Sequence, residues 1–189
     1  MFLRRLTIRN QLVFVIIIGG ILSLSTISYV LIRMHNNFAE HQFMLRHERL
    51  TTLMASEMAP ALHLSDGRII GKKVKAFVST VEENLILLKA YNLDGDEVFE
   101  KRNREQTPDL NNKIQKHLRK LKQGEEIRED FPETVVLLKP AFLPGDEIGG
   151  FIGVAWSKHE LTELRWELIQ MALLITATIL ISGGIIIIF

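Results

Sequence analysis

The chain has 189 residues, of which 47% are apolar, a composition that excludes a disordered protein and suits one modest domain together with membrane segments. Its 23 basic and 22 acidic residues give a formal charge of +1, so no global field favours nucleic acid, and we expect no nucleic-acid partner. Cysteine is absent, which excludes disulfides, thiolate nucleophiles and cysteine metal ligands.

Residues 12–32 form the first apolar segment, an uncharged run of 21 residues that is long enough as a helix to cross a hydrocarbon core of about 30 Å. The run ends without the small residues of a cleavage site, which favours a transmembrane helix over a cleaved signal peptide. Residues 1–11 carry three arginines and no acidic residue, which predicts a cytoplasmic N-terminus.

Residues 33–167 are the expected extracytoplasmic domain, and residues 35–62 predict a helix that prolongs the first membrane segment. Phe43, Leu50 and Met54 recur there at spacings of seven and four, which is the period of an amphipathic helix. This apolar stripe is broad enough to serve both the domain and a second subunit. We therefore predict a parallel homodimer through these three residues.

The next two helix boundaries are indicated by local chemistry. Pro60 should bend or end the first helix, because proline lacks the amide proton and crowds the preceding turn. Either Ser65 or Asp66 can then cap a second helix. The apolar residues between positions 70 and 81 lie along one side of that helix.

Short apolar runs bounded by turn residues predict an antiparallel sheet in an α+β domain. A third helix should lie between its second and third strands, with Thr107 as cap, Pro108 in the first position and Gly124 at the end. The segment 126–130 is charged and can form a fifth strand at the edge of the sheet. The strands are expected at residues 85–91, 97–100, 126–130, 134–143 and 149–156.

The end of the last strand is predicted to pass directly into a final helix. Ser157 and Glu160 fit a capping box, in which the two side chains satisfy each other's backbone amides. The helix should continue into a second span, residues 168–189, with Gln170 as its only strongly polar residue. The span closes at Phe189 without a basic residue, so we expect a truncated receptor with both ends in the cytoplasm.

This order of helices and strands between two spans resembles the periplasmic PAS-like or single Cache sensor modules of bacterial transmembrane receptors. Two stretches carry a local likeness, LLKAYNLDGDEVFE with its turn after an apolar strand, and IGGFIGVAWSKHE, where a strand passes into a helix. The resemblance implies a module that feeds a chemoreceptor, a histidine kinase or a diguanylate cyclase. The arginine, tryptophan and tyrosine signature of amino-acid-binding Cache domains has no match here.

The strand faces offer one candidate ligand site. Strand alternation puts Lys89 and Tyr91 on one side of their strand and Lys139 on one side of its partner. If these sides form one face, the three residues suit a small anion such as a carboxylate. The alternative is that the lysines lie at solvent-exposed strand ends.

The resemblance implies that the chain is the input module of a receptor in a bacterial inner membrane, as part of a two-component or chemotaxis system. The alternative is a membrane scaffold or assembly protein that binds a periplasmic partner. We expect no enzyme and no cofactor, since no nucleophile elbow, phosphate loop or HExxH occurs. Nor do we expect a metal site, because His35, His41 and His47 recur at intervals of six, which turns each about 120° from the last.

Overall fold

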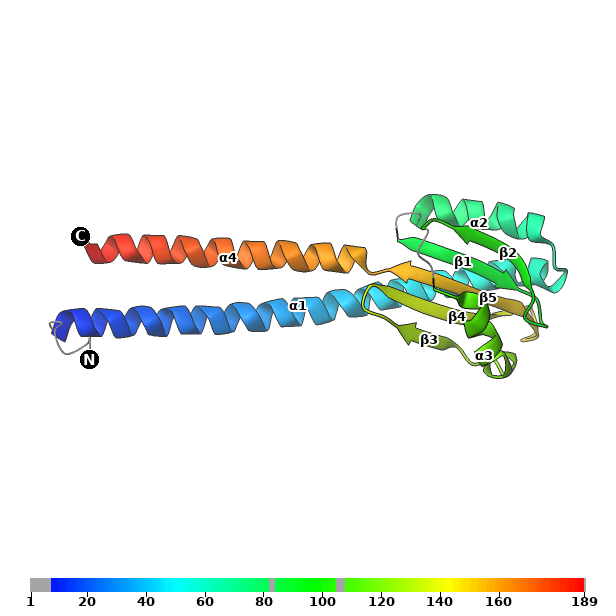
Figure 1. The fold of residues 1–189 in the computed structure, drawn as a ribbon, viewed down its shortest axis with the longest axis horizontal. Coiled ribbons are helices and arrows are strands. Elements are labelled where there is room, and N and C mark those ends of the chain that lie inside the picture. Colours follow the sequence, from blue (N-terminus) through cyan, green and yellow to red (C-terminus); the bar gives the residue numbers. More distant parts are fainter. Residues whose placement is uncertain (1–7, 82–83, 105–107, 189) are drawn as a thin grey trace. The chain divides into compact units, whose positions relative to one another are not determined.

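The computed structural model describes residues 8–81, 84–104 and 108–188, and its elements are drawn in Figure 1. It divides into two compact units, one made of Met1–His41 with Leu161–Phe189 and the other of Gln42–Glu160. The helices and strands, in chain order, are α1 (Ile8–His63), α2 (Gly67–Val81), β1 (Leu85–Tyr91), β2 (Glu97–Arg102), α3 (Leu110–Lys122), β3 (Ile127–Asp130), β4 (Thr134–Phe142), β5 (Ile148–Ser157) and α4 (His159–Ile188).

Helix α1 is continuous through 56 residues, which confirms that the first apolar segment and the domain share one helix. Pro60 does not end it, and the helix runs on to His63. The helix stops there because Ser65 takes a left-handed φ of 53°, while its amide donates to the Leu62 carbonyl at 2.9 Å. Pro60 therefore lies near the end of the helix, but the observed end comes about one turn after it.

One helix among the described residues is long and apolar enough to cross a membrane, the part of α1 from Ile18 to His63. Helix α4 continues through the second predicted span as far as Ile188. Its side chains are described only as far as residue 178, so the second crossing stays a prediction. The described residues thus support one span near the N-terminus.

The second unit is built on a five-stranded sheet in the order β2-β1-β5-β4-β3, in which every neighbouring pair is antiparallel. This confirms the predicted α+β domain, including β3 as a charged strand at the edge. Helix α3 packs against β4 and β5 on one face, and the second part of α1 lies on the other face (Figure 1). The sheet is therefore covered on both sides, as its almost continuously buried central strands require.

Helix caps set the boundaries of α2 and α3. Asp66 caps α2 by accepting from the amides of Arg68 and Ile69 at 3.0 and 3.2 Å. Asp109 caps α3 through the amide of Asn112, so the prediction of Thr107 as cap is wrong, and Thr107 itself lies outside the described residues. Thr107 and Asp109 are both residue types that can cap a helix, and the local sequence does not distinguish between them.

The start of β5 passes very close to the backbone of α1. A Cβ atom added at Gly149 would lie 2.6 Å from the carbonyl oxygen of Ala59, well inside van der Waals contact. Only glycine fits between this strand and the helix. The close approach fixes how β5 lies on α1.

We expect Gly149→Ala to lower the free energy of unfolding by about 2 kcal/mol, because strand or helix must shift to accept the methyl group. Thermal unfolding of the full chain in detergent, followed by tryptophan fluorescence, measures the loss. Gly71→Ala is the matched control, since its new methyl meets the edge of the Phe99 ring, which can rotate. Equal stability of the two variants would contradict the close approach.

Candidate functional site

The sheet separates the two lysines of the predicted anion site. Lys89 pairs with Gly153 of β5, whereas Lys139 pairs with Ile152 of the same strand. Neighbouring residues of a strand point to opposite faces, so the two lysines lie on opposite sides of the sheet. The predicted convergence of Lys89, Tyr91 and Lys139 is therefore wrong.

Lys89 and Tyr91 lie on the α3 side and share one acceptor, the side-chain oxygen of Asn111, at 3.2 and 2.9 Å. The Lys89 ammonium also contacts Glu97 at 2.5 Å and Glu100 at 2.9 Å. Burial alone would lower the pKa of Lys89, but the hydrogen bonds to these two carboxylates raise it above its ordinary value. Burial raises the pKa of the Tyr91 phenol, because it disfavours the charged phenolate. Because two carboxylates already neutralise Lys89, this residue is not suited to bind an anion.

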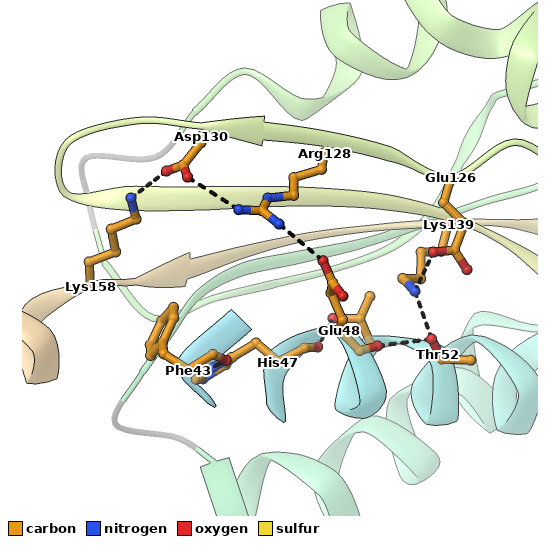
Figure 2. Close-up of polar contacts among 10 residues, drawn as sticks. Phe43, His47, Glu48, Thr52, Glu126, Arg128, Asp130, Lys139 and Lys158 are labelled. Carbon is orange, nitrogen blue, oxygen red and sulfur yellow. Dashed lines mark hydrogen bonds and ion pairs between the residues drawn. The ribbon is translucent and has the colours of Figure 1, made fainter. Parts of the chain in front are cut away.

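Lys139 lies on the other face and points at helix α1 (Figure 2). Its side chain is 6% exposed, and its ammonium donates to the Thr52 hydroxyl at 2.7 Å and to the Glu126 carboxylate at 2.6 Å. A buried ammonium needs such partners, since desolvation without them is costly. Lys139 therefore bridges α1 and the residue just before β3.

A second set of ion pairs runs from α1 across the edge of the sheet (Figure 2). Glu48 of α1 contacts Arg128 of β3 at 3.4 Å, and Arg128 contacts Asp130 at 3.5 Å. Asp130 forms an ion pair with Lys158, which directly follows β5. We call Glu48, Arg128, Asp130 and Lys158 the edge network. It connects the first helix with the residue that precedes α4.

The buried contact between α1 and the end of β5 is aromatic and polar at once. His47 is 2% exposed, and its ring lies 4.0 Å from Phe43 and 4.5 Å from Trp156 between centroids. The Trp156 indole donates to the Thr51 hydroxyl at 3.0 Å, and that hydroxyl donates to the His47 carbonyl at 2.7 Å. Sequence reasoning missed this cluster. The available signal was that His47 falls on the apolar stripe, four residues after Phe43.

The junction between β5 and α4 is capped differently from the prediction. The Ser157 hydroxyl accepts from the His159 amide at 3.2 Å, as a capping serine does. The Ser157 amide, however, donates to the backbone oxygen of Asn84 at 2.7 Å and is not free for Glu160. The Glu160 carboxylate instead accepts from the Asn84 side chain at 2.9 Å. The prediction of a reciprocal capping box is thus wrong. Ser157 still caps the helix, but Asn84 is the partner of both the Ser157 amide and the Glu160 carboxylate.

The predicted dimer residues are occupied within their own chain. Phe43 and Met54 are 6% and 0% exposed, and Leu50 is half-buried, because this stripe of α1 faces the sheet. Phe43 and Met54 cannot contact a second subunit without leaving the core, so these two residues do not form a dimer face. The homodimer itself stays a prediction.

The unit formed by residues 8–41 and 161–188 contains an apolar groove between α1 and α4, with a volume of about 490 Å³. Polar side chains in its lining include Ser28 and His35. The groove lies in the part of the chain predicted to enter the membrane. Among the described residues, no three His, Asp or Glu side chains are grouped so that they could hold a metal ion.

No family model matches the chain, and no curated protein matches it either. Solved structures similar to it include MglB with a tetrameric arrangement, at 10% identity and a TM-score of 0.34, covering 68% of this chain and 92% of that one. Another is the gliding protein MglB from Thermus thermophilus, also at 10% identity and a TM-score of 0.34, with 66% and 91% covered. At this level the likeness does not bear on function.

We expect the Lys89 cluster to stabilise the fold above acidic pH. The hydrogen bond from Lys89 holds the pKa of Glu100 below its usual 4.5, so its contribution is present above that pH and is lost as the pH falls through the lowered value. At neutral pH Glu100→Gln should cost about 1 kcal/mol of unfolding free energy, and the two proteins should converge in acid. Urea unfolding across this pH range measures it, with exposed Glu147→Gln as control. Parallel pH curves for wild type and Glu100→Gln would contradict the assignment.

Proposed function

We propose that this chain is the extracytoplasmic input module of a two-pass signalling receptor of the PAS-like or Cache type. The observation that carries the proposal is the way the two apolar helices join the domain. Helix α1 passes from the apolar segment into the sheet domain without a break. Only Lys158 separates the end of β5 from the start of α4. A displacement of the last strand relative to the first helix would thus be passed directly to the proposed spans, residues 12–32 and 168–189.

The contacts inside the domain support this mechanism. The edge network and the Trp156–Thr51 hydrogen bond both connect α1 with the end of β5, next to the start of α4. Exposed ion pairs contribute about 0 to 1 kcal/mol each, which is comparable to the difference between two signalling states. A stimulus of modest binding energy could therefore shift the equilibrium between the two signalling states without unfolding the domain. The output would come from a cytoplasmic signalling domain.

The rival proposal is a membrane scaffold that holds a periplasmic partner and transmits nothing. Both proposals place the domain outside the cytoplasm, so topology does not separate them. They differ at the junction of β5 and α4, where only a receptor needs two states of similar free energy.

Topology is the first test. Three arginines precede the first segment, which favours a cytoplasmic N-terminus and translocation of the domain. Alkaline phosphatase inserted after Gly124, in an exposed turn outside the sheet, should therefore be active in cells. A fluorescent protein joined before Met1 should fluoresce in the same cells. An inactive phosphatase together with an active cytoplasmic reporter at Gly124 would reverse the orientation.

Coupling is the second test. The chain is joined after Phe189 to the cytoplasmic half of a histidine kinase that drives a reporter gene. Ser157→Ala removes the acceptor of the His159 amide, and loss of a cap costs about 1 kcal/mol, so basal output should shift about fivefold in either direction. Ser56→Ala, the same change at an exposed position of α1, should leave output unchanged. An inserted and folded Ser157→Ala protein with unchanged output would favour the scaffold.

A further inference from the structure

His47 is an ionisable group in an apolar contact between the first helix and the last strand. Its ring lies between Phe43 of α1 and Trp156, the second-last residue of β5. Its Nδ1 atom lies 2.8 Å from the Phe43 carbonyl oxygen. A carbonyl oxygen only accepts, so Nδ1 carries the hydrogen and the neutral ring has its lone pair on Nε2. A further proton must therefore enter at Nε2.

The charged groups around His47 come from both ends of the domain. Arg46, the neighbouring residue of α1, opposes a positive ring, whereas Glu160 in the first turn of α4 favours it. Across the sheet edge, Lys158 pairs with Asp130 and Arg128 pairs with Glu48, so these charges are already compensated. Glu160 thus favours the charged ring, but less than burial and Arg46 oppose it.

Glu160 is also the residue that holds the start of α4. Its carboxylate accepts from the side chain of Asn84 at 2.9 Å. Trp156 near the end of β5 and Glu160 near the start of α4 thus lie on either side of the junction between strand and helix. A disturbance of His47 against Trp156 therefore acts next to this junction.

We propose that His47 is a proton-operated switch: on acidification its ring is protonated at Nε2, and the charge in this apolar contact loosens the packing of α1 against Trp156 at the end of β5, next to the start of α4. This inference rests on the proposed function and names protons as a stimulus of that receptor.

The direction of the switch follows from the environment of the ring. Burial lowers the pKa of His47, the hydrogen bond to Phe43 raises it, Arg46 lowers it and Glu160 raises it, with a net value below 6.5. The ring is therefore neutral at neutral pH and gains its charge only in acid. Between 6.5 and the lowered pKa the unfolded chain binds more protons, so the folded domain with its neutral ring loses stability as the pH falls.

The test uses the full chain in detergent micelles, with Trp166→Phe so that Trp156 is the only tryptophan of the chain. A protonated imidazole in contact with an indole quenches its fluorescence. Titration from about pH 8 to about pH 5 should show one quenching transition with a midpoint below that of free histidine. The transition should vanish in His47→Gln and persist in His63→Gln, which changes an exposed histidine of the same helix. Glu160→Gln, which keeps an acceptor for Asn84, should lower the midpoint.

The kinase fusion gives the second readout. Acidification should shift output in the wild type and in His63→Gln but not in His47→Gln. A fluorescence transition that is absent, or that survives in His47→Gln, overturns the switch. If the transition is present while output ignores pH, the switch also fails, and the proposed function stands provided that Ser157→Ala still shifts output. Output that ignores both pH and Ser157→Ala overturns both proposals. Should His47→Gln not fold, the wild-type titration and Glu160→Gln decide.

Discussion

The hydrogen bond from the Trp156 indole to the Thr51 hydroxyl is the contact on which the domain's arrangement depends. It joins residues 105 positions apart in sequence, at the place where the last strand ends and the first helix enters the domain. Both partners are completely buried, so the indole N–H needs this acceptor, and its loss would leave an unsatisfied donor in the core. Glycine at position 149 sets the other end of the same strand against Ala59 of the helix. Helix and strand therefore contact each other at both ends of β5.

Charge is distributed on the two faces of the sheet with a partner for each buried ammonium. Lys89 and Lys139 are 7% and 5% exposed, and each contacts at least one carboxylate. Their positions differ by one residue in the register against β5, and that single step places them on opposite faces. Lys89 helps to hold β2 and α3 on β1, whereas Lys139 holds α1 on the sheet. What the sequence suggested as one ligand site is thus two separate structural contacts.

The helices and strands could be predicted from local sequence because periodicity, turn residues and caps act within a few positions. The charged edge strand β3, the turn after Tyr91 and the glycine after α3 all follow from such signals. The relation between the strand faces could not be predicted, because the register of β1 is set by its pairing with β5 far along the chain, as Lys89 and Gly153 show. The role of Asn84 was missed for the same reason, since its partner Glu160 lies 76 positions away. The burial of His47 was not predicted, although the residue lies on the same helical stripe as Phe43 and Met54.

The domain separates the residues that maintain the fold from those that can change state. Trp156 and Met54 have no exposed surface, so a change in their packing has a high cost in free energy. The side chains of Glu48, Arg128 and Asp130 are 35%, 46% and 39% exposed, so their ion pairs are weak and can be exchanged at little cost. His47 belongs to both groups, since it packs as an aromatic side chain when neutral and becomes an uncompensated buried charge when protonated. A buried histidine in this position can convert a change of pH into a change of packing at the end of β5, next to the start of α4.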